Sequence, residues 1–427
     1  MKVNKLVLSL LAAGLSAGIL SGAQAADADR IKALEDQLQV LQQAIAELKN
    51  STPTKKEVAD LTDQVTLQGK ESVVLGDMPN SFRMPGSETS VRIYGFAEVN
   101  AIRDTGSVSP DDHFSWLPSQ PLNINTPATG MTRVTTQTSR FGFETSTPTA
   151  LGAFHTVIEA DFYAGDNSAL RLRHAYGEYA GFLIGQTWST FMDGDNFPES
   201  VDFNGPPGST SARTVQLRYT HNIPDVATFK FAVERNGSGS SKLNPTNDQP
   251  LSLVLRADKT FANGAALSLR AIRHTEIDAG GNSAVGYGLG VSGSFKFTDT
   301  LTGFGQFTKI DGDNVGNLVV GTNGARFDTT SGALAFDKTT GVVLGLNNVF
   351  NEKWRTTVSY GQSVSDETAV FKGGDNSSLK QWHLGFYYTP IKSVDLGAEY
   401  IKGTRTTFDG DTGDLNRFNL QARYSFN

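Results

Sequence analysis

The chain has 427 residues, of which 44 are glycine, 10% are aromatic and none is cysteine. Without cysteine, a disulfide scaffold, a thiolate metal site and a cysteine nucleophile are excluded. The formal net charge of −7 argues against a nucleic-acid-binding protein, because such proteins carry a basic surface.

Residues 1–25 are predicted to be a secretory signal peptide. Lys2 and Lys5 form its basic start, residues 6–20 form an apolar run, and Ala23-Gln24-Ala25 fits a small-residue cleavage site. A membrane-spanning anchor is the alternative, but the run is short and rich in glycine and serine. No later segment is a long uncharged apolar run, so a helical membrane protein is excluded.

Residues 26–69 are predicted to be a helical coiled-coil region, followed by a linker over 70–90. Apolar residues recur at spacings of three and four, which is a heptad pattern that leans towards two strands. Three heptads are marginal alone in water, so they need a partner. Self-association is favoured over a surface helix packed on the rest of the protein. The heptad positions hold Ile31, Leu34, Leu38, Leu41, Ile45 and Leu48.

From residue 91 onward, apolar and polar side chains alternate with the period of a β-strand. In the last segment, Phe418, Leu420 and Tyr424 share one face, and Asn419 and Gln421 share the other. Sixteen such segments are predicted, near 91–101, 133–147, 152–163, 169–179, 181–188, 212–221, 226–235, 250–260, 264–275, 284–297, 300–310, 339–349, 353–363, 378–389, 393–402 and 414–426.

The links between these segments alternate between short and long. Short links such as 222–225 and 350–352 alternate with long ones such as 189–211 and 311–338. Tight turns on one side, long loops on the other and an even strand number are typical of a membrane barrel. Residues 91–427 are therefore predicted to form a 16-stranded antiparallel transmembrane β-barrel with both termini in the periplasm. A secreted soluble β protein is the alternative.

Two short motifs are interpreted as structural rather than catalytic. The segment 288–293 has the glycine pattern of a dinucleotide site, but no helix follows it, and its glycines lie along a predicted strand. Residues 311–314 start like a calcium loop, but Thr322 occupies the position that requires glutamate. The histidines form no zinc-protease motif, and nothing pairs His174 with a serine. We expect neither an enzyme nor a cofactor.

The wall of the predicted channel carries more bases than acids. A basic wall favours anions, and the guanidinium group matches the two oxygens of a carboxylate. The alternative is that the arginines are paired with neighbouring acids and only stiffen the barrel. The predicted pore-lining arginines are Arg92, Arg140, Arg171, Arg173, Arg218, Arg256, Arg270, Arg355 and Arg423.

Three stretches resemble one known family. SFRMPGSETSVRIYGF at 81–96, RLRHAY at 171–176 and IGQTWSTF at 184–191, together with the heptads, resemble the DcaP-like trimeric porins of Gram-negative bacteria. The resemblance implies a homotrimer in the outer membrane, in contact with lipid and lipopolysaccharide, with a periplasmic coil. It also implies the uptake of dicarboxylic acids and related small anions.

In trimeric porins the third long loop folds inward and narrows the channel. By that resemblance, loop 189–211 would place Asp193, Asp195, Glu199 and Asp202 opposite the arginine wall. An ordinary surface loop or a contact between protomers is the alternative.

The sequence thus predicts an outer-membrane porin for passive diffusion of small hydrophilic solutes, with a preference for anions. The alternative is a structural barrel that tethers the envelope and transports little. In that case residues 29–68 would contact peptidoglycan or a periplasmic partner.

Overall fold

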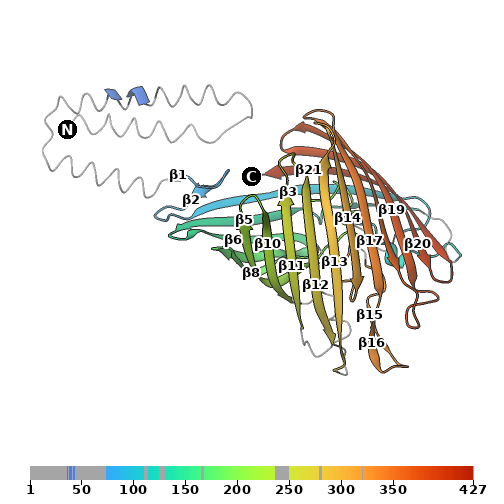
Figure 1. Ribbon diagram of the computed structural model, residues 1–427. Helices are drawn as coiled ribbons and strands as arrows, with labels where there is room; N and C mark the ends of the chain where they lie inside the picture. Colours follow the sequence, from blue (N-terminus) through green and yellow to red (C-terminus); the bar gives the residue numbers. More distant parts are fainter. Residues whose placement is uncertain are drawn as a thin grey trace. The chain divides into compact units, whose positions relative to one another are not determined.

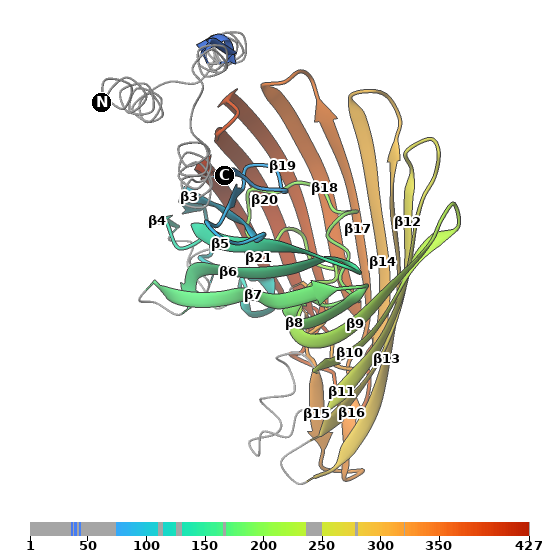
Figure 2. The ribbon, with the colours of Figure 1, turned by 90° about the vertical axis from the view of Figure 1, so that its left-hand side faces the viewer.

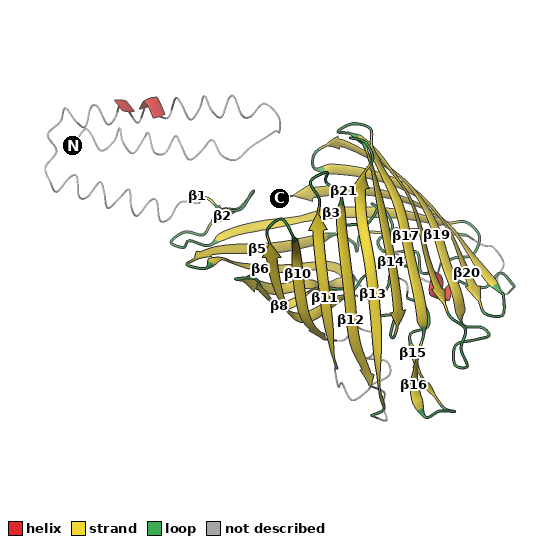
Figure 3. Cartoon of the chain, viewed as in Figure 1, coloured by secondary structure: helices red, strands yellow, loops and turns green. Residues whose placement is uncertain are grey.

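The computed structural model describes residues 36, 38–40, 42, 43, 74–109, 114–124, 130–164, 168–235, 250–277, 281–319 and 321–426. The chain divides into two units, Met1–Ser72 and Val73–Asn427. In the first unit the described residues are helical (Figure 3). The signal peptide and most of the predicted coiled coil lie outside the described residues. In the described part of the chain, no helix is long and apolar enough to cross a membrane.

The second unit is a closed antiparallel barrel, as predicted. Each strand pairs with the next along the chain, and the last strand pairs with the first through Leu420 and Ala101 (Figures 1 and 2). The strands of the ring are β3 (Ser90–Asp104), β4 (Met131–Thr135) with β5 (Arg140–Thr149), β6 (Gly152–Ala164), β7 (Ala169–Tyr179), β8 (Phe182–Trp188), β9 (Arg213–Ile223), β10 (Ala227–Arg235), β11 (Leu251–Thr260), β12 (Ala266–Ile277), β13 (Ser283–Lys296), β14 (Leu301–Asp311), β17 (Lys338–Val349), β18 (Trp354–Ser365), β19 (Asn376–Ile391), β20 (Val394–Thr407) and β21 (Thr412–Phe426).

The ring has sixteen positions, because β4 and β5 are two parts of one strand, and both pair with β3. Four shorter elements were not predicted. β1 (Val74–Leu75) and β2 (Phe82–Arg83) lie in the segment expected to be a linker, and β2 pairs with β3 through Phe82 and Val91. β15 (Ala325–Asp328) and β16 (Ala333–Phe336) form a hairpin in the long link after β14 (Figure 1).

The two faces of the strands differ as the alternation predicts. On β21, Phe418 and Leu420 are 50% and 58% exposed, whereas Asn419 and Gln421 between them are 3% and 8% exposed. Apolar outer faces recur around the ring, which is the pattern of a barrel in contact with lipid. A slip of one residue would turn Arg417, near the middle of β21, towards the lipid at a cost of roughly 2–4 kcal/mol near the bilayer midplane, so the alternation fixes the register of this strand.

Long links fill part of the interior. The link between β3 and β4 contains the short 3-10 helix η1 (Leu117–Ser119), which contacts β19 and β20. The links after β8 and β14 meet at an isolated bridge between Thr210 and Leu318. The barrel therefore encloses packed loops as well as open space.

Candidate functional site

The link between β8 and β9, residues 189–212, lies on the inner wall of the barrel. Its start is held by Glu234 of β10, which accepts hydrogen bonds at 2.6 Å from the hydroxyl of Ser189 and from the backbone N–H of Thr190. The ring of Phe191 then packs in an apolar cluster with Val254 and Ile272. We call residues 189–212 the inner loop.

Glycines on the inward faces of the strands allow the inner loop to lie against the wall. A Cβ atom at Gly345 would stand 2.5 Å from Pro198, and one at Gly361 would stand 2.3 Å from the carbonyl oxygen of Pro207. A Cβ atom at Gly288 would be 3.1 Å from the ring of Phe191. Gly288 belongs to the glycine pattern at 288–293, so part of that pattern gives room to a loop.

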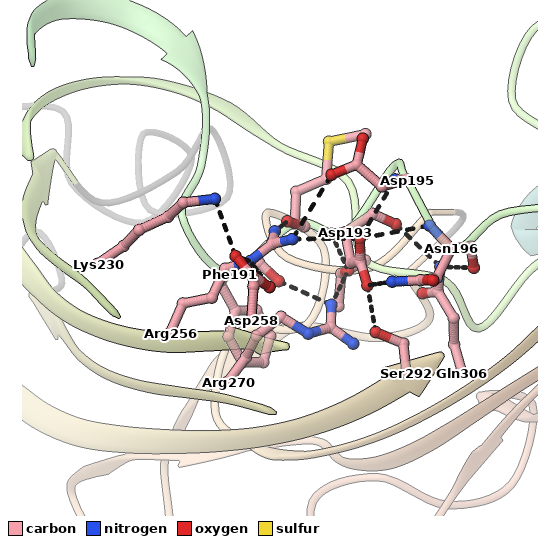
Figure 4. A network of polar contacts seen from close by, with 12 residues as sticks. Phe191, Asp193, Asp195, Asn196, Lys230, Arg256, Asp258, Arg270, Ser292 and Gln306 are labelled. Carbon is pink, nitrogen blue, oxygen red and sulfur yellow. Dashed lines mark hydrogen bonds and ion pairs between the residues drawn. The ribbon is translucent and has the colours of Figure 1, made fainter. Parts of the chain in front are cut away.

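Arg256 of β11 and Asp193 form the centre of a polar network under the inner loop (Figure 4). The guanidinium group of Arg256 lies 3.3 Å from Asp193 and 2.7 Å from Asp258, and it also donates to the carbonyl oxygen of Met192. The hydroxyl of Ser292 donates to Asp193. These bonds join the inner loop to two strands of the wall.

Gln306 and Arg270 extend the same network (Figure 4). The side-chain amide of Gln306 donates to the carbonyl oxygens of Asp193 and Asn196, both at 2.9 Å. Arg270 donates to the carbonyl oxygen of Phe191 at 2.9 Å and to the hydroxyl of Thr210 at 2.6 Å. The loop backbone is therefore held at several points by the wall.

Burial alone would raise the pKa of Asp193, but the hydrogen bond from Ser292 and the charge of Arg256 lower that pKa below its ordinary value. Asp193 is thus held as a carboxylate in the network. Burial raises the pKa of Asp202, because the charge of Arg417 offsets only part of the burial. Two neighbouring acids of one loop therefore have opposite shifts.

Two of the four predicted loop acids share one arginine, and a third contacts another. Asp193 and Asp195 lie 3.3 and 3.8 Å from Arg256, and Glu199 lies 2.7 Å from Arg355. Asp202 accepts a hydrogen bond at 2.8 Å from the backbone N–H of Ser115. Of these four acids, only Asp195 has a largely exposed side chain. The structure thus gives three of them structural bonds inside the barrel.

The arginines of β5 and β7 rest on buried acids of β6. Arg171 lies 2.7 Å from Asp161, and Arg173 lies 2.8 Å from Glu159 and 2.9 Å from Asp161. Arg140 lies 3.4 Å from Glu159. Asp161 and Glu159 are 0% and 7% exposed, and Arg173 is buried with them at 3%. The side chains of Arg140 and Arg171 are more exposed than the acids that hold them.

The remaining predicted arginines fall into two groups. Arg92 is paired with Glu144, Arg423 lies 2.6 Å from Glu98, and Arg355 also contacts Asp395 at 3.1 Å. In the described part of the chain, Arg218 and Arg270 form no ion pair. The alternative reading, in which the arginines are paired with neighbouring acids, thus describes most of the set but not these two.

Two cavities open beside the inner loop. The larger, of about 500 Å³, is lined by five arginines and three carboxylates, and the smaller, of about 330 Å³, is lined by three bases and one carboxylate. Trp188, Met192 and Gly194 border both cavities. The charged lining residues are Arg140, Arg171, Arg173, Arg213, Arg423, Glu98, Asp193 and Asp202 in the first, and Arg218, Lys230, Arg256 and Asp195 in the second.

Arg213 lines the larger cavity but is absent from the prediction. It has the same parity along β9 as Val215 and Leu217, whose side chains are exposed on the outer face, so alternation assigns it to that face. At the first residue of the strand its guanidinium group lies 5.0 Å from the ring centre of Trp188. Alternation predicts side-chain direction less well at the end of a strand, where the chain passes into a loop. No other feature of the sequence indicates that Arg213 lines the cavity.

Arg417 is also absent from the prediction, although its parity on β21 is inward. Its side chain is 0% exposed and lies 2.7 Å from Asp104, which is also 0% exposed. Leu117 of η1 packs nearby against Leu379, Ile401 and Leu415, which point inward from β19, β20 and β21. This side of the lumen is filled by packed side chains and buried charge.

Within the described residues, no group of three or more acids and histidines could hold a metal ion. The barrel matches solved structures of outer-membrane proteins. The crystal structure of the outer membrane channel DcaP of Acinetobacter baumannii has 27% sequence identity and a TM-score of 0.73, and the match covers 82% of this chain and 100% of that one.

Two further structures share the fold at 14% identity. OmpT of Vibrio cholerae, in a trimer form, has a TM-score of 0.54 over 79% of this chain and 99% of its own. The anion-selective porin from Comamonas acidovorans has a TM-score of 0.53 over 79% of this chain and 100% of its own. Among proteins of curated function, none is detectably similar in sequence. The model of the DcaP outer membrane protein family matches residues 18–426, and the chain therefore belongs to that family.

Proposed function

We propose that this outer-membrane porin passes small hydrophilic anions, including dicarboxylic acids, by passive diffusion through the two cavities beside the inner loop. The observation that carries the proposal is the excess of guanidinium groups over carboxylates among the residues that line both cavities. A ring of one sign of charge in a water channel sets the sign of the ions that pass.

The arrangement of the pairs strengthens this excess. Asp161 is 0% exposed, whereas the side chain of Arg171 that it holds is 27% exposed. An anion in the cavity therefore meets the guanidinium group more closely than the carboxylate behind it. Arginine also donates two parallel hydrogen bonds to a carboxylate, which suits a solute with a carboxylate at each end.

We also propose that three chains assemble into a homotrimer, as the trimer form of OmpT does. The wall is lowest at β8, which has 7 residues. A strand of that length is about 23 Å long, and because barrel strands are tilted it spans less than that across the membrane. A hydrophobic band is about 25 Å tall. Phe182 and Ile184 on this strand are 51% and 66% exposed. A neighbouring protomer would cover this low wall.

The test is the reversal potential of the full-length protein in planar bilayers under a potassium chloride gradient. A reversal potential towards the chloride equilibrium supports the proposal, and one towards the potassium equilibrium overturns it. Added succinate should then lower the chloride current at concentrations where a neutral solute of similar size does not. Silence at high salt would favour the alternative of a tether with little transport.

A further inference from the structure

One edge of the guanidinium group of Arg171 is available to a solute. The Nε and Nη2 atoms of this side chain donate to the two carboxylate oxygens of Asp161, at 2.9 and 2.7 Å. Within the described residues its Nη1 atom forms no hydrogen bond, and the side chain is 27% exposed at the larger cavity. The neighbouring Arg173 is 4% exposed and bonded to two acids. Arg171 is therefore the arginine of β7 that a permeating anion reaches more easily.

Two aromatic rings lie close to this guanidinium group. Its Cζ atom is 4.6 Å from the ring centre of Tyr163, near the end of β6, and 5.5 Å from that of Phe203 in the inner loop. The ring centre of Phe203 also lies 5.8 Å from Cζ of Arg173. A cation within about 6 Å of a ring centre is attracted by the ring. The inner loop thus contacts both arginines of β7 through an aromatic side chain.

Phe203 belongs to a cluster of three rings that come from separate parts of the chain. Its ring is nearly parallel to those of Tyr163 and Phe114, with centre distances of 5.7 and 6.0 Å and angles of 18° and 24°. Phe114 lies in the link between β3 and β4, and its ring centre is 5.5 Å from that of Tyr163. Aromatic rings at such distances attract one another. These contacts restrict the movement of Phe203 relative to Arg171.

The backbone on either side of Phe203 is also fixed. The N–H of Asp202 donates to Glu399 of β20 at 2.8 Å, and the N–H of Asn204 donates to the carboxylate of Asp202 at 3.1 Å. The second bond closes a turn in which an aspartate binds the backbone two residues further on. The other oxygen of Asp202 accepts the N–H of Ser115 at 2.8 Å. Asp202 therefore fixes the turn that carries the ring of Phe203.

We propose that Phe203 is a positioning residue of the channel, whose ring holds the guanidinium group of Arg171 with Nη1 towards the permeating anion. The inference rests on the proposed function, because it assigns a residue to the anion path. The ring attracts the cation but occupies none of its N–H donors, so Nη1 stays available to a solute. The inner loop then acts on selectivity through an aromatic ring that carries no charge.

The test is Phe203→Leu in the full-length protein, measured as the anion-to-cation permeability ratio in planar bilayers under a potassium chloride gradient. Leucine keeps an apolar side chain but has no ring. A cation–π contact at a partly exposed site is worth a factor of about two to five, so the ratio should fall about twofold. Unitary conductance should change less than the ratio. Phe203→Tyr keeps a ring and should recover most of the lost anion preference.

A second variant shows whether the ring acts through Arg171. Arg171→Gln alone should lower the permeability ratio, and Phe203→Leu added to it should lower the ratio no further, because the cation that the ring holds is already gone. Asp161 keeps Arg173 as its partner at 2.9 Å, so this variant leaves no buried carboxylate unpaired.

The matched control removes a ring from an arginine outside the cavities. The Cζ atom of Arg326 lies 4.9 Å from the ring centre of Phe371, and neither residue lines either cavity. Phe371→Leu should therefore leave the permeability ratio unchanged. A fall of the same size as for Phe203→Leu would overturn the inference, because the effect would not depend on the anion path.

Three other outcomes also decide. Equal ratios for wild type and Phe203→Leu would overturn the inference, even if the conductance changes, because the ring would then only occupy space. An equal fall for Phe203→Leu in the wild-type and the Arg171→Gln backgrounds would overturn it too. A wild-type channel that prefers cations fails the proposed function, whereas the comparison between wild type and variants still tests the role of Phe203, so the two failures are distinguishable.

Discussion

Two sides of the lumen differ although the same rule of alternation builds both. Along β5–β8 the inward side chains include Arg140, Arg171 and Arg173, which line an open cavity. Along β19–β21 they include Leu379, Ile401 and Leu415, which are covered by Leu117. Inward parity therefore means wet over one part of the wall and packed over another, and β21 belongs to both, because its Arg423 lines the open cavity. The loops decide which side stays open to solutes.

Breaking the buried ion pair on the packed side should have the largest effect. Arg417 and Asp104 are both 0% exposed, and Arg417→Leu leaves the carboxylate of Asp104 with one arginine fewer in a dry site. Removing one partner of a buried pair costs about 3–5 kcal/mol where the other charge is left unpaired. Asp104 keeps its ion pair with Arg133, so we expect a cost at the lower end of this range. The measurement is the urea midpoint of the reconstituted barrel.

The control is Arg83→Gln, which removes an ion pair with the partly exposed Asp77. Loss of this exposed pair should cost less than about 1 kcal/mol. Similar urea midpoints for Arg417→Leu and Arg83→Gln would contradict the proposed difference between the buried and the exposed ion pair.

Removing the apolar cover should convert the packed side into an open one. Leu117→Ala takes a fully buried side chain from the cluster with Ile401 and Leu415, at a cost of about 2–5 kcal/mol to the docking of this link. The link should then detach, and single-channel conductance should rise. Leu344→Ala, an exposed change on the outer face, is the control and should not alter conductance. A conductance equal to wild type for Leu117→Ala would mean that the packed side does not restrict the path.

The sequence predicts the ring well and the interior less well. Alternation along strands such as β21 reports the outer face directly, because lipid tolerates few polar groups there. Alternation cannot separate a wet interior from a packed one, since Leu415 of the apolar cluster and Arg423 of the larger cavity have the same inward parity on β21. Whether an inward residue is wet or packed depends here on Leu117, which lies in the link between β3 and β4. The path of this link cannot be predicted from a periodic pattern, because the link has none.

The ion pairs show the same limit. Parity along β5 and β7 predicts that their arginines point inward, but pairing across strands depends on register. Arg171 faces Asp161 because those residues are opposite in the ladder. Arg213 was missed because it lies at a strand end, where the side chain turns towards Trp188. Long-range contacts between Arg355 and Glu199 connect residues that no local pattern relates.

Asp313 lies in the link after β14, which also covers part of the interior. Burial raises the pKa of Asp313 from 3.8 to about 6, against the opposing hydrogen bonds from Val315 and Gly316. The folded link therefore binds this proton more tightly than the unfolded link does. Its stability is greatest below about pH 4 and is lost as the pH rises to about 6.

Asp313→Asn should remove this pH dependence and stabilise the link at neutral pH by roughly 2–3 kcal/mol. Hydrogen exchange of the amides in residues 313–319 is the measurement, at pH values from 4 to 7 after correction for intrinsic rates. His274, which accepts a hydrogen bond at 2.8 Å from the N–H of Asp313, is unchanged in both proteins. Parallel pH profiles for wild type and variant would contradict the assignment to Asp313.

The smallest effect tests whether the open side sets selectivity. Arg213 and Arg218 line the two cavities and form no ion pair within the described residues, so replacing both by glutamine strands no buried carboxylate. A unit charge about 7 Å from the ion path is worth on the order of 0.6 kcal/mol in water, or about threefold in ion occupancy. The anion-to-cation permeability ratio should therefore fall several-fold at low salt and less at high salt.

Arg103→Gln with Arg273→Gln removes the same charge from the exposed outer face and should leave the ratio unchanged. If both double variants keep the wild-type ratio, the unpaired guanidinium groups do not act on the permeating ion, and the selectivity must come from the paired arginines of β5 and β7.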